Sequence, residues 1–160
     1  MIYKNGKPIV TIYTDGSWSP DEKYGGWAAI LISLRPTYAI EICGSEKDTT
    51  IPRMELTAVI KALEKLTMSC EIRILSDSMY VVNGSVAAYT WRKQHWKDKK
   101  GNTINNADLW KKYIRLINHF GHHVIVRWVK AHSVNQYNNR CDFLAKNARH
   151  RLTATGIEVE

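Results

Sequence analysis

Three strand-like segments precede the first helical segment of this chain, and that order restricts the folds it can adopt. Short runs of β-branched, aromatic and aliphatic residues occupy 9–14 and 26–34, with turn-forming residues between them, and 37–45 fits a third strand. Strands that follow one another without an intervening helix predict an antiparallel meander. A helix is predicted next at 52–67, where apolar residues recur at helical spacing and Pro52 lies in the first turn.

Strands and helices alternate in the rest of the chain. The pattern predicts strands at 71–77 and 123–129. It predicts helices at 78–88, 90–98 and 107–119 between these strands, and a last helix at 136–150. Because strands separated by helices commonly pair in parallel, the whole order predicts an α/β fold. Its sheet would be mixed and five-stranded, with three antiparallel strands followed by two parallel strands and with helices on its faces.

The composition favours one globular domain over residues 1–160. A chain of this length buries roughly 68–70% of its unfolded surface. The longest apolar stretch, 27–32, is far shorter than the ~18 residues that a transmembrane helix needs, and the N-terminus lacks a hydrophobic signal core. Cys43, Cys70 and Cys141 are odd in number and have no CxxC spacing, which favours free thiols in a reducing cytosol. We therefore expect a cytoplasmic protein without a membrane segment.

Four acidic residues lie where a carboxylate is costly unless its charge is compensated. Asp15 and Asp77 end runs that resemble buried strands, while Glu55 and Asp142 lie beside the apolar stripes of helices. Since ligand sites of open α/β sheets lie beyond the carboxyl ends of strands, we expect the four to meet there. Oxygen ligands without a His/Cys cluster favour a hard divalent cation such as Mg²⁺ or Mn²⁺. Within a chain of net charge +8, such a site predicts phosphoryl-transfer chemistry on a nucleic acid.

Each of these residues also has an ordinary structural interpretation when taken alone. Asp15 fits a turn, and Asp77 fits the N-cap of the following helix. Glu55 fits a solvated helix position, and Asp142 fits one half of a surface ion pair. These alternatives stay open for each residue, but a shared site accounts for all four together.

Five motifs in order make the chain similar to the type 1 ribonucleases H. They are YTDGS, RMEL, SDSMYV, WVKAH and NRCDFLA, at 13–17, 53–56, 76–81, 128–132 and 139–145. The resemblance runs from about residue 10 to residue 149 and implies the ribonuclease H-like fold. It also implies an endoribonuclease that hydrolyses the RNA strand of RNA/DNA hybrids and leaves 5′-phosphate and 3′-hydroxyl ends.

The resemblance further implies two-metal-ion catalysis with Mg²⁺, for which Mn²⁺ could substitute. Asp15 would bridge both ions. Glu55 and Asp77 would complete the site of the ion at the leaving group, and Asp142 would support the ion at the nucleophile. His132 matches the family histidine that aids proton transfer or product release, although a single histidine at a strand end is also commonly structural.

The positive charge is concentrated in residues 89–112, which carry seven Lys or Arg residues against two Asp, a net +5 of the chain's +8. This segment fits a solvated helical face, or a protrusion that grips a duplex. By resemblance, a basic protrusion spans about 89–106. The same resemblance implies that Gly16 and Ser17 offer backbone groups to the RNA strand and that Thr50 and Asn106 hold a DNA-strand phosphate. Within the protrusion, Trp91 would lie against the DNA strand and Trp96 would help to build the protrusion. Lys97 belongs to the same set of substrate-binding residues.

The chain departs from the family pattern beside the predicted phosphate pocket. Ile51 and Pro52 replace the usual Asn and Asn or Gln before RMEL, and Asp48 replaces a common arginine. Met79 stands where bacterial members commonly have Gln. We therefore expect weaker hybrid binding than in a typical member, and discrimination between RNA and DNA that is less strict.

Other functions also fit parts of the sequence. A non-catalytic module that binds hybrids or duplexes would need the same surface but not the carboxylates. The nuclease domain of a retroelement polyprotein, or another nuclease of the superfamily, would keep the fold. The start methionine, the short N-terminus and the basic protrusion favour a separate enzyme. We expect it to be a monomer, with a short C-terminal tail at about 151–160.

Overall fold

The computed structural model of this protein describes residues 3–21, 23–34, 37–131 and 134–155 of the 160-residue chain. The strands are β1 (Tyr3–Lys4), β2 (Lys7–Ser19), β3 (Tyr24–Leu34), β4 (Thr37–Glu46), β5 (Glu71–Ser76) and β6 (His123–Trp128). The helices are α1 (Ile51–Glu64), α2 (Met79–Lys93), α3 (Ala107–Phe120) and α4 (Gln136–Thr155). No described helix has the length and apolar character needed to cross a membrane.

The main sheet has the strand order β4-β3-β2-β5-β6. The pairs β4–β3 and β3–β2 are antiparallel, and the pairs β2–β5 and β5–β6 are parallel. This confirms the predicted five-stranded mixed sheet. The two-residue β1 adds a hairpin to the start of β2 through Asn5 and Gly6, whose φ angles are 52° and 76°. An Asn-Gly pair is a strong signal for such a turn, but the predicted elements did not include this hairpin.

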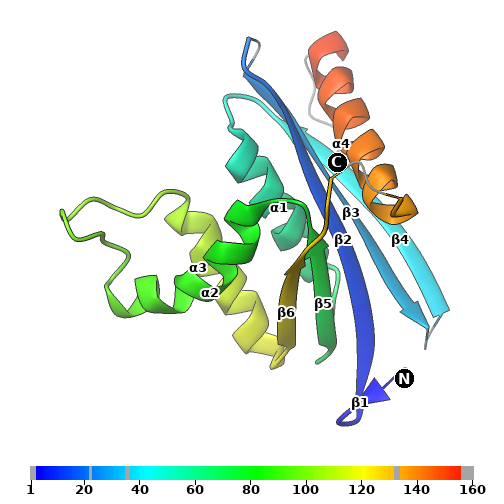
Figure 1. Ribbon diagram of the computed structural model, residues 1–160, viewed down its shortest axis with the longest axis vertical. Helices are drawn as coiled ribbons and strands as arrows, with labels where there is room; N and C mark the ends of the chain where they lie inside the picture. The colour runs from blue at the N-terminus through cyan, green and yellow to red at the C-terminus, as the bar shows by residue number, and fades with distance from the viewer. Residues whose placement is uncertain (1–2, 22, 35–36, 132–133, 156–160) are drawn as a thin grey trace.

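Helices cover both faces of the sheet, as predicted (Figure 1). Gly25 and Gly26 are neighbours on β3 and therefore point to opposite faces. A Cβ atom on Gly25 would meet Met54 of α1, whereas one on Gly26 would meet the backbone oxygen of Ala145 in α4. Figure 1 shows α1, α2 and α3 together on one side of the sheet and α4 alone on the other.

The main core lies between the sheet and the side that carries α1 and α3. Alternate residues of β2 are buried, as expected for a strand that packs through one face, and α1 places its apolar stripe against them. Each fully buried aliphatic side chain contributes about 1.5–3 kcal/mol to stability. The largest fully buried side chains include Ile12, Leu31, Leu56, Ile60, Leu63, Ile74 and Trp110.

Several predicted boundaries differ from the structure. α4 continues to Thr155, five residues beyond its predicted end at 150 and into the predicted tail. β2 continues through Ser19 instead of ending near residue 14, because its pairing with β3 extends to Ser19 opposite Tyr24. α1 ends at Glu64, three residues before the predicted end at 67. The predicted helices at 78–88 and 90–98 are wrong as separate elements. Residues 79–93 form the single helix α2, because no Gly or Pro interrupts it between 88 and 90. Residues 94–98 lie beyond α2, and His95 and Trp96 have left-handed φ angles.

Candidate active site

Asp15 and Asp77 lie side by side at the carboxyl end of the parallel ladder between β2 and β5. The parallel ladder between β2 and β5 ends with Thr14 opposite Ser76, so each aspartate is the next residue on its strand. Asp15 remains inside β2, where it pairs with Ala28 of β3, and the interpretation as a turn residue is therefore wrong. The two aspartates therefore meet beyond the last pair of the parallel ladder, as predicted.

Glu55 joins the two aspartates from α1. Carboxylate oxygens of Asp15, Glu55 and Asp77 all lie within 4.8 Å of one another. Gly16 allows this approach, because a Cβ atom there would lie 2.6 Å from the backbone nitrogen of Glu55. Asp15 and Glu55 are buried, at 4% and 7% exposure, whereas Asp77 is half-buried. Glu55 is therefore not a solvated helix residue.

The electrostatics of the cluster call for a cation. Burial, and then the charges of Asp77 and Asp142, raise the pKa of Asp15 to about 8, although the Gly16 N–H donates a hydrogen bond of 2.9 Å to its Oδ1. Burial and the neighbouring aspartates also raise the pKa of Glu55 well above its usual value. Within the described part of the chain, the buried Oε2 of Glu55 has no hydrogen-bond partner. Hard carboxylate donors with an unsatisfied buried oxygen fit a divalent metal ion.

Asp142 lies near this cluster but is not one of its three tightly grouped members. It belongs to α4, and its charge contributes to the raised pKa of Asp15. Its Oδ2 accepts a hydrogen bond of 3.0 Å from Lys146, so Asp142 does form a helical ion pair. Its partner is Lys146, because the preceding Arg140 pairs with Glu41 of β4. The neighbouring Cys141 donates from Sγ to the backbone oxygen of Tyr13 at 3.3 Å, which fixes α4 beside β2. His132, the predicted catalytic histidine, lies outside the described residues.

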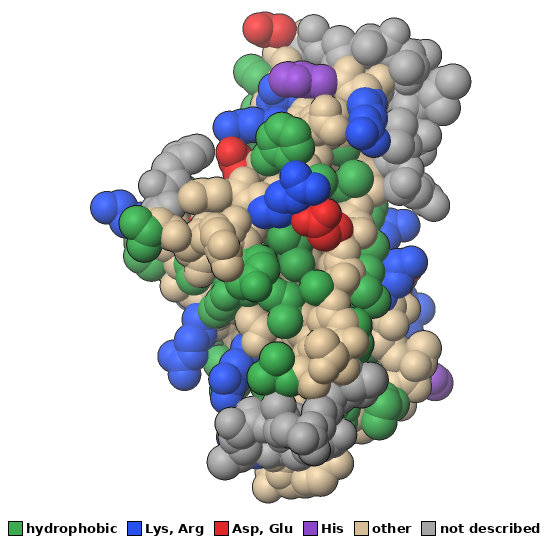
Figure 2. Space-filling view, turned by 90° about the vertical axis from the view of Figure 1, so that its right-hand side faces the viewer, with side chains coloured by type: hydrophobic (Ala, Val, Ile, Leu, Met, Phe, Trp, Pro, Cys, Tyr) green, Lys and Arg blue, Asp and Glu red, His purple; other side chains and the backbone are tan. Residues whose placement is uncertain are grey.

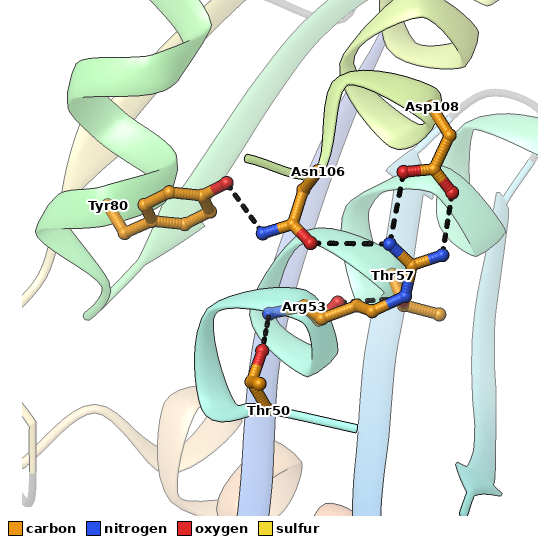
Figure 3. A network of polar contacts seen from close by, with 6 residues as sticks. All are labelled: Thr50, Arg53, Thr57, Tyr80, Asn106 and Asp108. Atoms are coloured by element: carbon orange, nitrogen blue, oxygen red, sulfur yellow. Dashed lines mark hydrogen bonds and ion pairs between the residues drawn. The ribbon is translucent and has the colours of Figure 1, made fainter. Parts of the chain in front are cut away.

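A polar network joins two of the predicted substrate-binding residues (Figure 3). Thr50 is the N-cap of α1, and its Oγ1 accepts a hydrogen bond of 3.3 Å from the backbone N–H of Arg53. The Arg53 guanidinium donates to Asn106 Oδ1 at 3.2 Å and to both carboxylate oxygens of Asp108 at 3.1 and 2.7 Å. Asn106 in turn donates to the Tyr80 hydroxyl at 3.0 Å.

Arg53 connects the network, and like Tyr80 and Asp108 it was assigned no role from the sequence pattern. Its two partners, Asn106 just before α3 and Asp108 in its first turn, lie 53 and 55 positions further along the chain, a distance at which a sequence pattern gives no signal. Asn106 precedes α3 with a left-handed φ of 58°, which Asn tolerates better than most residues. Its side chain does not cap α3 but faces Arg53 and Tyr80 (Figure 3).

Aromatic side chains attach the basic protrusion to the domain. Trp91 is half-buried and meets Trp110 edge-on, with ring centroids 6.0 Å apart. The Lys111 ammonium lies 5.8 Å from the ring centroid of Trp96. Lys97 donates to Thr103 Oγ1 at 2.8 Å across the base of the loop. Trp91 and Trp96 therefore join this segment to α3.

The opposite side of the molecule has a different surface. Figure 2 shows the side that carries α4, where hydrophobic side chains form a central cluster and the Lys and Arg side chains are dispersed around it. The concentrated positive charge of residues 89–112 belongs to α2, the following loop and the start of α3.

Comparison with known proteins identifies the family. The family model described as RNase H matches residues 7–150. The chain belongs to the RNase H family. The Ribonuclease H of Acetivibrio thermocellus is 46% identical over 140 residues, which cover 85% of this chain and 91% of that protein. The Ribonuclease H of Wolbachia pipientis wMel is 41% identical over 143 residues, which cover 89% and 96%.

Solved structures agree with this RNase H membership. A type 1 RNase H with the type 2 active-site motif superposes with a TM-score of 0.81 at 29% identity, over 99% of this chain and 80% of that one. A foamy viral protease-reverse transcriptase in complex with RNA/DNA hybrid has a TM-score of 0.74 at 21% identity, over 89% of this chain and 20% of that one, and supports the fold alone. The predicted family, the ribonuclease H enzyme class and the fold are confirmed.

Proposed function

We propose that this enzyme hydrolyses the RNA strand of RNA/DNA hybrids and leaves 5′-phosphate and 3′-hydroxyl ends. The observation that carries the proposal is the convergence of Asp15, Glu55 and Asp77, whose carboxylate oxygens lie within 4.8 Å of one another at the carboxyl end of the β2–β5 ladder. Three carboxylates in so small a volume are electrostatically unfavourable without a cation, and divalent ions beside a phosphodiester are a common solution for nucleases.

Asp15, Glu55, Asp77 and Asp142 would hold two divalent ions, with Mg²⁺ expected and Mn²⁺ as a possible substitute. When bound, the ions activate the attacking water and stabilise the leaving 3′-oxygen. The chain's own part is to hold the oxygen donors in place. The Gly16 N–H orients Asp15 Oδ1, and the backbone of α1 directs Glu55 inward past Gly16. We assign His132 a supporting role in proton transfer or product release.

The remaining predicted contacts form the proposed hybrid-binding surface. Thr50 and Asn106 would hold a phosphate of the DNA strand, and Arg53 keeps the two in a fixed relation. Gly16 and Ser17 would offer backbone groups to the RNA strand from β2. Hybrid duplexes are recognised largely by shape and 2′-hydroxyls, so little sequence preference is expected. Within the basic protrusion, the residues assigned to this surface are Trp91, Trp96 and Lys97.

Weaker hybrid binding than in a typical member is part of the proposal. Asp48 is exposed, and its carboxylate would repel a phosphate near Thr50. Ile51 is 37% exposed and begins α1, where it offers no polar side chain to the substrate. A cytoplasmic location and a monomeric state stay predictions.

The direct test compares an RNA/DNA hybrid, double-stranded RNA, double-stranded DNA and a duplex with one embedded ribonucleotide, each incubated with the protein in Mg²⁺. We expect cleavage of the RNA strand of the hybrid, and loss of that cleavage in Asp15→Asn and Asp77→Asn variants. Hybrid binding without cleavage in either Mg²⁺ or Mn²⁺ would overturn the proposal in favour of a binding module. Cleavage of double-stranded RNA as well would indicate relaxed discrimination between RNA and DNA.

A further inference from the structure

A cationic groove runs along the outer side of α3. Two adjoining hollows of about 650 and 320 Å³ share the side chains of Arg115 and His119. We call the joined hollows the α3 groove. The residues that matter for its chemistry are Arg92, Trp96, Lys111, Ile114, Arg115 and His119.

The basic side chains of α3 follow one line in this groove. Lys111, Arg115 and His119 are each four residues apart, so they lie on one side of the helix at steps of about 6 Å along its axis. Ile114 is buried at 4% exposure and provides an apolar floor, and Trp96 and Arg92 line the groove from the α2 side. The groove therefore combines regularly spaced cations with apolar and aromatic surface.

Four Lys and Arg side chains line the groove, and three of them have no acidic partner among the described residues. Arg92, Lys111 and Arg115 are exposed, and none of the ion pairs between described residues includes them. The fourth, Lys112, lines the smaller hollow and pairs with Glu64 of α1 at 2.7 Å. Aligned and uncompensated cations favour a polyanion as the ligand.

The groove extends away from the carboxylate cluster. His119 lies in the last turn of α3, which leads directly into the start of β6, where His123 pairs with Glu71 at the start of β5. Asp77 follows the other end of β5, and six residues of strand span about 20 Å. A ligand in the groove is therefore separate from a phosphodiester at the cluster.

We propose that the α3 groove binds a single strand of nucleic acid outside the cleavage site. Its cations neutralise successive phosphates of an extended strand, while Trp96 and Ile114 contact sugars or bases. Aromatic and apolar side chains beside the cations suit a single strand, because its unpaired bases can contact them whereas the bases of a duplex are paired and stacked inside it. Single-stranded flanks of a hybrid would gain affinity from this contact without any change in the chemistry at the cluster.

The test measures fluorescence anisotropy of a labelled oligothymidylate of about ten nucleotides over a series of salt concentrations. Two variants change the groove, Arg115→Glu by charge reversal and Asn118→Asp by adding charge with little change in shape. Lys65→Glu reverses an exposed charge at the end of α1 and is the matched control. We expect Arg115→Glu to weaken binding about tenfold and to lower the salt slope by about 0.7 for each phosphate that the groove no longer neutralises. Asn118→Asp should weaken binding less, and Lys65→Glu should leave it close to wild type.

Equal weakening by Lys65→Glu and Arg115→Glu would mean that net charge alone is responsible, and would overturn the proposal. Groove variants that bind the oligonucleotide like wild type would also overturn the proposal. Displacement of the oligonucleotide by polyglutamate at equal charge concentration would overturn it too, since that result favours an acidic peptide as the ligand. Unchanged melting temperature and unchanged cleavage of a blunt hybrid establish that the variants are folded. The binding assay requires no cleavage, so it is independent of the proposed nuclease activity.

Discussion

Asp15 and Asp77 are the first residues beyond the last pair of the parallel ladder between β2 and β5. This relation places two carboxylates from positions far apart in the sequence on neighbouring strands, and α1 adds Glu55 to them. The sheet therefore gathers charges that repel one another at neutral pH. The energetic cost of this gathering leads to the first two predictions.

Asp15→Asn is expected to stabilise the metal-free protein at neutral pH while it abolishes cleavage. Asparagine keeps the shape and removes a carboxyl group that at neutral pH must either take up a proton or bury its charge on folding, so the free energy of unfolding should rise by roughly 1–3 kcal/mol. Chemical denaturation in EDTA measures this change. Unfolding at the same or lower denaturant concentration than wild type would contradict the cost that we assign to the buried carboxylate.

The stability of the metal-free protein is expected to depend on pH through Asp15. Its pKa is raised from 3.8 to about 8, so the folded state binds more protons than the unfolded state between these values. This contribution to stability is therefore greatest at low pH and is lost as the pH rises toward 8. Burial lowers the pKa of His122, which has the opposite effect at acidic pH.

The difference in unfolding free energy between wild type and Asp15→Asn cancels the His122 effect and leaves the contribution of Asp15, including its effect on the pKa of Glu55. We expect the difference to grow from pH 5 to pH 8 and to shrink when Mg²⁺ is added, because bound cations compensate the carboxylates. A difference that is constant over this pH range would contradict the raised pKa.

Gly16→Ala is expected to displace α1 from the cluster. The new Cβ would lie 2.6 Å from the backbone nitrogen of Glu55, a clash that flexible side chains cannot relieve. We expect a loss of about 2–4 kcal/mol in stability and a fall in cleavage rate at saturating Mg²⁺. Thr11→Ala on the same strand serves as the control for a general loss of strand stability. Cleavage at the wild-type rate by Gly16→Ala would show that the approach of α1 is unimportant.

Arg53→Lys is expected to weaken hybrid binding by about three- to tenfold without changing the cleavage rate at saturating substrate. Lysine keeps the charge but cannot contact Asn106 and both oxygens of Asp108 at once, so Asn106 loses its fixed orientation. Separate measurement of KM and kcat tests this. Asp108→Asn leaves the Arg53–Asn106 hydrogen bond in place and should have a smaller effect, and wild-type KM in Arg53→Lys would exclude a positioning role.

The sequence predicted the features that depend on chain order and local pattern. Five strands, their mixed pairing and the meeting of Asp15 with Asp77 follow from the order of apolar segments, because a parallel ladder brings the ends of its strands together. The small β1 hairpin also had a local signal in Asn5 and Gly6, although it was not among the predicted elements.

Features that depend on contacts between distant residues could not be predicted in the same way. The link from Arg53 to Asn106 requires the relative placement of α1 and α3, which no local pattern contains. The end of α2 depends on the left-handed backbone of His95 and Trp96, residues without a strong preference for that conformation. The α3 groove likewise requires α2 and α3 to lie side by side.

The most direct test of the metal-dependent site is the rate of RNA-strand cleavage in a labelled hybrid, measured for wild type and Glu55→Gln over a Mg²⁺ titration. Glutamine preserves the size of the side chain but removes the charge of a buried oxygen donor. We expect cleavage by wild type only when Mg²⁺ is present, and a fall of at least a hundredfold in Glu55→Gln at every concentration, roughly 3 kcal/mol in barrier height. Cleavage by wild type in EDTA, or near-normal cleavage by Glu55→Gln, would contradict a carboxylate site that holds the catalytic ions.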